Sequence, residues 1–304
     1  MKKILITGCC GFIGSSLVKR LIDNHKIYGI DDFSSGKKII KHKNFKFIQG
    51  KCEDPRIFKK IYHRIDYIYH LCGQSSGEKS FYNPLDDVAR NLLTTVNLLE
   101  FYIKNKCKRF IFTSSMSVYG DSKKTRVSEK DKTTPKSFYG LSKLCSEEYI
   151  KKYYLKGVNY TILRLFNVIG EDQSLDNYEQ GMLRIYLSQV KNTEKLLIKG
   201  SKNRFRDFIH IDEVLNYLEE APLNNKAKNQ TINVGSGKKV HVRELEKILK
   251  NNVNKKFKTF YKKSTPLDQF GIYSNNSKLQ KIFKIYAKTN IKKKIANLVK
   301  SHSI

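Results

Sequence analysis

The sequence predicts an α/β fold in which a doubly wound parallel sheet is joined to a smaller C-terminal lobe. Short β-rich runs alternate with helical segments over the first half of the 304-residue chain, a pattern typical of a parallel sheet covered on both faces. A glycine-rich turn joins the first such run to the first helical segment. After residue 167 the alternation loosens into mixed, lysine-rich segments, which indicates the second lobe.

The expected strands and helices follow one another along the first half of the chain. Strands are expected where apolar and β-branched residues run together, at residues 4–7, 27–30, 45–48, 67–71, 109–113 and 160–165. Helices are expected where apolar residues recur at helical spacing or a proline opens a turn, at residues 13–24, 55–63, 84–104 and 137–155. Parallel strands linked in this way place their carboxyl ends at one edge of the sheet, where such folds bind ligands.

The composition excludes several classes of protein. Hydrophobic residues make up 39% of the chain, enough for a core, so wholesale disorder is not expected. The formal net charge is +31, but 48 of the 59 basic residues are lysines spread along the chain, whereas a nucleic-acid surface gathers Arg and Lys on one face. No apolar run approaches the roughly 20 residues of a membrane helix, and none near the start is long enough for a secretion signal. We therefore expect a cytoplasmic protein without a membrane or nucleic-acid partner.

Six cysteines are present, and none is arranged as in a metal or disulfide site. No pair forms Cys-x-x-Cys, and no Cys/His cluster has the spacing of a zinc site. We interpret all six as reduced thiols and expect no metal: Cys9, Cys10, Cys52, Cys72, Cys107 and Cys145.

Residues 8–14 read Gly-Cys-Cys-Gly-Phe-Ile-Gly between a predicted strand and a predicted helix. Gly8, Gly11 and Gly14 let the backbone turn sharply and approach a pyrophosphate. The pyrophosphate then lies on the N-terminus of the helix that Phe12 and Ile13 begin. Strand, glycine triplet, helix and second strand in this order predict a dinucleotide site of the Rossmann type. The alternative is a tight strand–helix turn without a ligand.

Two acids follow at the end of the second predicted strand. Asp31 lies 17 residues after Gly14, and Asp32 comes next. A carboxylate at this point accepts hydrogen bonds from a ribose 2′-hydroxyl and repels a 2′-phosphate. The sequence therefore favours NAD as the cofactor, while Lys37 and Lys38 downstream leave NADP open.

A tyrosine and a lysine four residues apart on a helix can exchange a proton with a substrate hydroxyl, because the ammonium lowers the pKa of the phenol. Two such pairs are poorly placed, one at a helix end away from the ligand edge and one in a loop: Tyr102/Lys106 and Tyr119/Lys123. Tyr139 and Lys143 lie in the first turns of a predicted helix, beyond Ser115 at the end of a predicted strand. Tyr139 and Lys143 are therefore the predicted proton-transfer pair.

Six segments, in order, resemble the extended short-chain dehydrogenase/reductase family. They are the glycine loop at 8–14, Thr-Ser-Ser-Met-Ser-Val-Tyr-Gly at 113–120, Tyr-Gly-Leu-Ser-Lys at 139–143, Arg-Leu-Phe-Asn at 164–167, Arg-Asp-Phe-Ile-His-Ile-Asp at 206–212 and Asn-Val-Gly at 233–235. The subgroup they resemble is the NAD-dependent nucleotide-sugar epimerases and dehydratases. The resemblance implies a nucleotide-sugar substrate, with a UDP-sugar favoured, and a homodimer formed through the helices at 84–104 and 137–155.

The resemblance also implies roles for individual residues. Tyr139 takes the proton from the sugar C4 hydroxyl, Ser115 hydrogen-bonds the same oxygen, and Lys143 binds the nicotinamide ribose. Three residues run along the cofactor: Leu71, Cys72 and Gly73. Others contact the substrate or its diphosphate: Ser75, Ser76, Asn91, Ser115, Asn167, Arg206 and Asp268. For Arg206, an ion pair with Asp207 is the structural alternative.

The residues after Ser115 separate the reactions of this family. Its sugar 4,6-dehydratases typically carry Asp-Glu there for the removal of water, whereas this chain has Met116 and Ser117. We therefore predict a 4-epimerase for surface polysaccharide biosynthesis, in which Tyr139 and NAD oxidise C4 transiently and hydride returns to the other face. A 4,6-dehydratase or a 4-ketoreductase is the alternative within the family. A relative that binds NAD or nucleic acid without catalysis is the alternative of another class.

The same resemblance divides the chain. Residues 1–166 are expected to form the NAD-binding Rossmann domain, to which residues 205–234 return. Residues 167–304 are expected to form most of the nucleotide-sugar-binding lobe. Glu78 and Lys79 face either the sugar or solvent in this arrangement.

Overall fold

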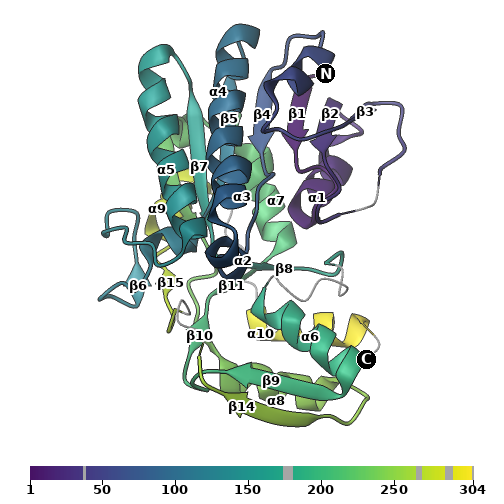
Figure 1. Ribbon diagram of the computed structural model, residues 1–304, viewed down its shortest axis with the longest axis vertical. Helices are drawn as coiled ribbons and strands as arrows, with labels where there is room; N and C mark the ends of the chain where they lie inside the picture. The colour runs from purple at the N-terminus through teal and green to yellow at the C-terminus, as the bar shows by residue number, and fades with distance from the viewer. Residues whose placement is uncertain (37–38, 174–180, 265–268, 285–289, 303–304) are drawn as a thin grey trace.

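The computed structural model describes the chain except for residues 37–38, 174–180, 265–268, 285–289 and 303–304. A seven-stranded parallel sheet forms its centre, in the order β12-β7-β5-β4-β1-β2-β3 (Figure 1). Its strands are β1 (Lys3–Thr7), β2 (Lys26–Asp31), β3 (Phe45–Gln49), β4 (Tyr67–His70), β5 (Arg109–Ser115), β7 (Tyr160–Leu165) and β12 (Gln230–Val234). All six predicted strands are confirmed with ends within two residues, and the sheet gains β12, which is not among them.

The order of the strands reverses at β1. From β1 the chain moves outward through β2 to β3, and it then returns to β4 on the other side of β1. The loops that follow β1 and β4 therefore run in opposite directions and leave a crevice at the carboxyl ends of these strands. The glycine loop is the one that follows β1.

Helices cover both faces of the sheet. On one face α1 (Phe12–Leu21) contacts α7 (Ile211–Glu220). The other face carries α3 (Pro84–Val88), a π-helical turn (Ala89–Leu93), α4 (Thr94–Asn105) and α5 (Phe138–Tyr153). A separate apolar cluster fills the space beneath each layer. The predicted helices at 13–24, 84–104 and 137–155 are confirmed, the second with the π-helical turn inside it.

The predicted helix at 55–63 is wrong. The segment forms a 3₁₀ helix of six residues, η1 (Pro55–Lys60), which the Asp54 carboxylate caps by accepting from the Arg56 N–H at 3.0 Å. Ile57 and Phe58 are buried in the core. The N–H groups of Ile57 and Ile61 donate to carbonyls three residues back, at Asp54 and Phe58, which is the bonding of a 3₁₀ helix, and the backbone is extended again at Ile61.

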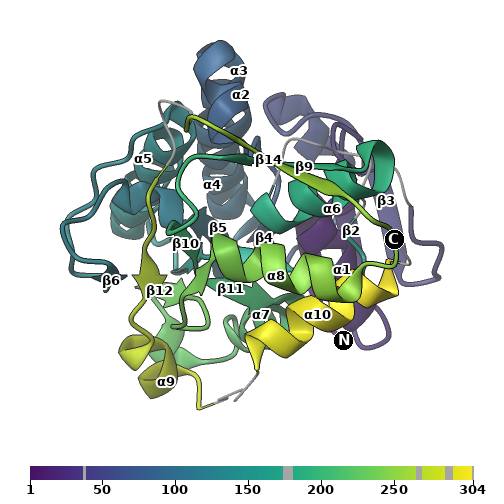
Figure 2. The same cartoon turned by 90° about the horizontal axis from the view of Figure 1, so that it is seen from below.

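A second lobe lies beyond the end of the sheet at which β7 leads into β8 (Figures 1 and 2). Its strands pair in twos: β8 (Asn167–Ile169) with β11 (Phe208–His210), β9 (Lys195–Lys199) with β14 (Lys258–Lys262), and β10 (Phe205–Arg206) with β13 (Val240–His241). Three helices enclose its apolar core: α6 (Met182–Thr193), α8 (Val242–Asn252) and α10 (Ile291–Ser301). Figure 2 shows α8 and α10 side by side across this lobe.

Several short elements complete the structure. These are α2 (Gly77–Tyr82), α9 (Ser277–Ile282), the pair β6 (Arg126–Val127) and β15 (Tyr273–Ser274), and the 3₁₀ turns η3 (Met116–Tyr119), η4 (Tyr154–Lys156) and η5 (Asn225–Ala227). Among the described residues, no helix combines the length and the apolar character needed to cross a bilayer.

Candidate active site

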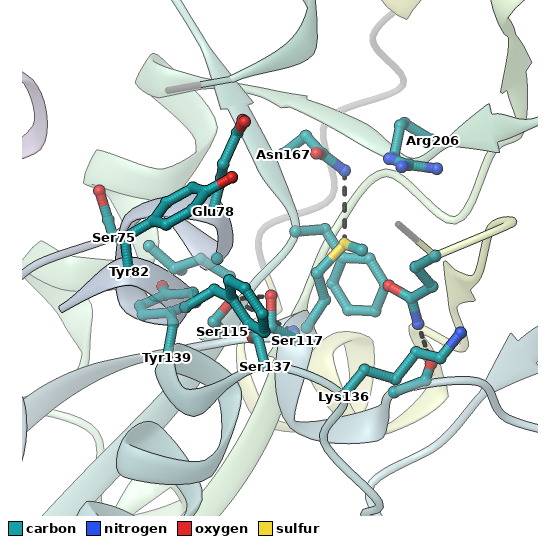
Figure 3. Close-up of a pocket in the computed structure, with 17 residues that line it drawn as sticks. Ser75, Glu78, Tyr82, Ser115, Ser117, Lys136, Ser137, Tyr139, Asn167 and Arg206 are labelled. Carbon is teal, nitrogen blue, oxygen red and sulfur yellow. Dashed lines mark hydrogen bonds between the residues drawn. The ribbon is translucent and has the colours of Figure 1, made fainter. Parts of the chain in front are cut away.

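Three cavities lie at the carboxyl ends of the strands. The glycine-loop cavity has a volume of about 280 Å³ and is lined among others by Gly11, Phe12, Lys143, Val168 and Arg184. The β2-edge cavity, of about 70 Å³, adjoins it at the glycine loop and includes Asp31, Asp32 and Arg90. The lobe cavity, of about 420 Å³, is lined by residues of the sheet end, α2 and the second lobe (Figure 3).

Two of these cavities share part of their walls. Five residues line both the glycine-loop cavity and the lobe cavity: Ser75, Ser115, Tyr139, Leu165 and Phe166. Ligands bound in the two cavities would therefore meet beside the Ser115 and Tyr139 hydroxyls. The arrangement suits a reaction between the two ligands.

The glycine loop is fixed by its own packing. Gly8 has a φ of +71°, and a Cβ atom there would lie 2.8 Å from the Cys72 Cα. A Cβ on Gly14 would lie 2.0 Å from the Gly8 carbonyl oxygen. The first turn of α1 has no side-chain cap at Gly11, so its backbone N–H groups point toward the cavity without helical partners. This close approach and the positive helix end fit the diphosphate of a dinucleotide.

Asp31 is positioned by the same loop. Its carboxylate accepts from the backbone N–H of Cys10 at 2.9 Å and of Phe33 at 2.8 Å. Burial raises the pKa of Asp31, and these two hydrogen bonds oppose the rise. Each oxygen keeps a lone pair for a ribose hydroxyl at the wall of the β2-edge cavity. The residues present thus fit NAD, while Lys37 and Lys38 lie outside the described residues.

Asp32 has a different partner from Asp31. Its carboxylate pairs with the Arg90 guanidinium at 3.2 Å and accepts from the Ser34 N–H at 3.0 Å. Arg90 in turn contacts Asp86 at 2.9 Å. Asp32 therefore lines the β2-edge cavity as part of an ion-pair network.

Ser115 and Tyr139 come from two elements that the sheet brings together. Ser115 ends β5 and caps η3, where its Oγ accepts from the Ser117 N–H at 3.1 Å. Tyr139 lies in the first turn of α5, which Ser137 caps. Burial raises the pKa of the Tyr139 phenol to about 12, and hydrogen bonding with the Ser115 side chain opposes that rise. The pair can therefore share and move a proton at the wall between the cavities.

Lys143 lies one turn after Tyr139, deeper in the glycine-loop cavity. Its side chain is 5% exposed, and its ammonium donates to the Thr113 carbonyl at 3.1 Å and lies 4.7 Å from the Phe112 ring centre. Burial lowers the pKa of Lys143 to about 8. The lysine thus places a buried, readily deprotonated cation beside the predicted nicotinamide position.

The lobe cavity gathers residues predicted to contact the substrate. Asn167 and Arg206 lie on the wall opposite Ser115 and Tyr139 (Figure 3). Asn167 donates through Nδ2 to the Asp207 carbonyl at 2.9 Å. Arg206 is 8% exposed and donates to the carbonyls of Phe205 and Phe270. Burial lowers the pKa of Arg206 to about 10.

Asp207 has a structural role of its own. Its carboxylate accepts from the backbone N–H groups and hydroxyls of Ser236 and Ser274, and from the Gly237 N–H. These contacts link the end of β12 to the end of β15.

The other predicted substrate contacts are distributed unevenly. Ser75 lines the wall shared by both cavities, whereas Ser76 is buried and caps α2. Asn91 lies behind Gly73, where a Cβ on that glycine would meet the Asn91 Oδ1 at 2.3 Å. Glu78 lines the lobe cavity, and Lys79 does not. Asp268 lies outside the described residues.

Several lining residues were not singled out from the sequence. Met116 and Ser117, which follow Ser115 in the chain, both line the lobe cavity. Lys136 and Gln269 join them there, with Lys136 paired to Asp121 and Gln269 donating to the Gly120 carbonyl. Arg184 lines the glycine-loop cavity from α6. None of these three belongs to a local motif, so only the folded arrangement identifies them.

The chain was compared with known proteins. The model of the NAD dependent epimerase/dehydratase family matches residues 4–235. A Methanocaldococcus jannaschii protein named as a candidate UDP-glucose 4-epimerase is 33% identical over 286 residues, 92% of each chain. UDP-glucuronic acid decarboxylase 1 of Xenopus tropicalis is 28% identical over 83% of this chain and 60% of its own length. The structure of Thermotoga maritima UDP-glucose 4-epimerase with UDP-glucose matches with a TM-score of 0.92 at 29% identity, over 99% of this chain and 98% of that one.

Proposed function

Since this chain belongs to the NAD-dependent epimerase/dehydratase family, we propose that this enzyme is a 4-epimerase of nucleotide sugars that acts on a UDP-hexose. The observation that carries the proposal is the position of Ser115 and Tyr139 at the wall shared by two cavities. The relatives named for UDP-glucose 4-epimerase activity, at 33% and 29% identity, support the class of substrate.

In this proposal the chain's own residues handle the proton. Tyr139 accepts the proton of the C4 hydroxyl and later returns one to the same oxygen. Ser115 donates a hydrogen bond to that oxygen, and its contact with the phenol favours the phenolate. Lys143 adds a buried cation to the same cavity, which favours the anion through space. When bound, NAD supplies the oxidant for C4 and then the reductant for the resulting ketone.

The residues of the lobe cavity favour epimerisation over dehydration. Removal of water across C5 and C6 needs an acid beside the leaving hydroxyl. Met116 and Ser117 occupy the wall next to Ser115, and neither can supply that proton. Glu78 is the one carboxylate among the described residues that line this cavity, and 62% of its side chain is exposed. Its carboxylate also pairs with the Lys199 ammonium at 4.0 Å, so Glu78 is an exposed ion-pair partner and not an acid enclosed beside a leaving hydroxyl.

The test is proton NMR of the NAD-loaded enzyme with UDP-, GDP-, CDP- and dTDP-hexoses in deuterated water. The expected product is the C4 epimer of one or more UDP-hexoses, without deuterium on the sugar carbons. A 4-keto-6-deoxy product that carries deuterium at C5 would overturn the proposal and give Glu78 the role of the acid. Tyr139→Phe is the matched control, since it removes only the phenolic oxygen.

We also propose a homodimer formed through the helical layer of α3, the π-helical turn and α5. Large apolar side chains on these elements are exposed: Leu85, Val88, Leu93, Leu141 and Tyr149. These elements contact one another in the chain, so the side chains share one region of the surface, which is typical of an interface. Light scattering should give twice the chain mass, and Leu93→Glu with Leu141→Glu should reduce it to one chain. A cytoplasmic location and a role in polysaccharide biosynthesis remain predictions.

A further inference from the structure

Two buried arginines of the second lobe face two different cavities. Arg184, on α6, and Arg206, in β10, are each 8% exposed. Arg206 lines the lobe cavity, and Arg184 lines the glycine-loop cavity. Neither arginine lines the other's cavity. The second lobe thus contributes one buried arginine to the lining of each of the two cavities.

The edge of the second lobe reaches the first turn of α1. A Cβ on Gly170, just after β8, would lie 3.0 Å from the Phe12 ring. Two residues further on, the Asp172 carboxylate contacts the Lys19 ammonium of α1 at 2.5 Å. This packing fixes the lobe beside α1, and Arg184 lines the cavity together with residues 11–14. Arg184 of the second lobe and the glycine loop of the sheet therefore line the same cavity.

The charge of the glycine-loop cavity suits an anion. The charged side chains among the described residues that line it are Lys143 and Arg184, and no described carboxylate lines it. The N-terminus of α1 adds the positive end of a helix dipole. A guanidinium forks onto two phosphate oxygens and, unlike an ammonium, keeps its charge when buried.

We propose that Arg184 contacts a diphosphate across the gap between the sheet and the lobe, and that this diphosphate belongs to NAD and not to the UDP-sugar. The proposal rests on the NAD dependence of the family and not on the 4-epimerase reaction. The cofactor is then held from two sides, by the backbone of the glycine loop and by a side chain of the second lobe. Such a contact keeps NAD in place while the sugar is oxidised and reduced.

The experiment measures the binding of each ligand alone, by titration calorimetry with NAD-stripped protein. Arg184→Gln is expected to weaken NAD binding about 10- to 100-fold, the loss of one or two charge-assisted hydrogen bonds. It is expected to change UDP binding less than about twofold, a change within about 0.5 kcal/mol, because Arg184 does not line the lobe cavity. Lys191→Gln, at the exposed end of the same helix, is the control for charge and should leave both affinities unchanged.

Arg206→Gln is the complementary variant. Because Arg206 lines the lobe cavity, its loss should weaken UDP binding with little effect on NAD binding. If Arg184→Gln weakens UDP and spares NAD, the diphosphate is that of the sugar nucleotide and the proposal is overturned. If it changes neither affinity, Arg184 serves the lobe alone and the proposal is equally overturned. If Arg184→Gln fails to fold, Arg184→Lys is used instead. The lysine keeps the positive charge but cannot bond two phosphate oxygens at once, so it should still weaken NAD binding several-fold. Because no sugar turnover is measured, the result stands whichever reaction the enzyme catalyses.

Discussion

The glycine-loop cavity and the lobe cavity are built in contrasting ways. Backbone turns and strand ends of the first 143 residues form most of the glycine-loop cavity, with glycines at 8 and 14 that the loop packing requires. Side chains from distant segments form the lobe cavity, from Glu78 on α2 to Gln269 near the end of the chain. Backbone geometry recognises what nucleotide cofactors have in common, whereas scattered side chains can vary with the sugar. The contrast explains why the cofactor could be predicted and the sugar could not.

Tyr139→Phe is expected to produce the largest effect. The phenolic oxygen lies at the wall that the two cavities share, so its loss should lower kcat about 10²- to 10⁴-fold, the range for a positioned acid–base group. NAD affinity should change little, because the ring remains. Steady-state kinetics and calorimetry measure the two quantities. A variant that loses NAD binding along with activity would show that the two cavities are not functionally separate.

Asp31→Ala tests the cofactor side alone. The carboxylate is held by two backbone N–H groups at the β2-edge cavity, so we expect it to accept from the ribose diol. Its removal should weaken NAD about 10-fold or more, the cost of losing a hydrogen bond to a charged group. UDP binding should stay unchanged. An NAD affinity equal to that of the wild type would contradict the placement of the adenosine ribose.

Lys143→Met tests the buried cation through the free energy of unfolding. Folded Lys143 loses its proton near pH 8, whereas an unfolded lysine does so near 10.4. Between these values the unfolded chain binds more protons, so the stability of the wild type rises with pH. From pH 8 to pH 10 the wild type should gain about 2 kcal/mol relative to the methionine variant. Urea unfolding at several pH values measures this, and parallel pH profiles would show that Lys143 keeps its proton.

Glu78→Gln should have the smallest effect. The side chain is largely solvated at the rim of the lobe cavity, so an epimerase should lose less than about threefold in kcat/KM, within the range of surface contacts. A dehydratase that used Glu78 as its acid would lose about 10²-fold or more. The variant therefore distinguishes an epimerase from a dehydratase, and because Glu78 is exposed the substitution should leave the fold unchanged.

The sequence predicted the sheet because each strand is a short apolar run between breaks. It predicted the glycine loop because three glycines follow a strand and precede a helix. It did not identify β12 as a strand, since residues 230–234 become part of the sheet only by pairing with β7. The prediction of an α-helix at 55–63 was wrong because the Asp54 cap and the buried Ile57 and Phe58 hold a 3₁₀ helix of six residues there. Local periodicity does not report such anchors.

The residues of the site also divide into those that the sequence predicted and those that only the folded structure identifies. Ser115, Tyr139 and Lys143 belong to motifs that are short in sequence, and the structure brings them to one wall. Arg184 and Gln269 come from the second half of the chain and Lys136 from the loop before α5, and each reaches its cavity only in the folded molecule. Each was one basic or polar residue among many in a chain of net charge +31. Their placement depends on long-range contacts that no motif encodes.

The fate of a deuterium atom at C4 of the sugar tests the proposed 4-epimerase mechanism most directly. UDP-glucose deuterated at C4 is incubated with the NAD-loaded enzyme in ordinary water, and the product is analysed by NMR and mass spectrometry. The proposed 4-epimerase mechanism predicts UDP-galactose that keeps its deuterium at C4, because the two cavities meet at Tyr139 and the same cofactor serves both half-reactions. Loss of the deuterium, or a product unchanged at C4, would contradict it.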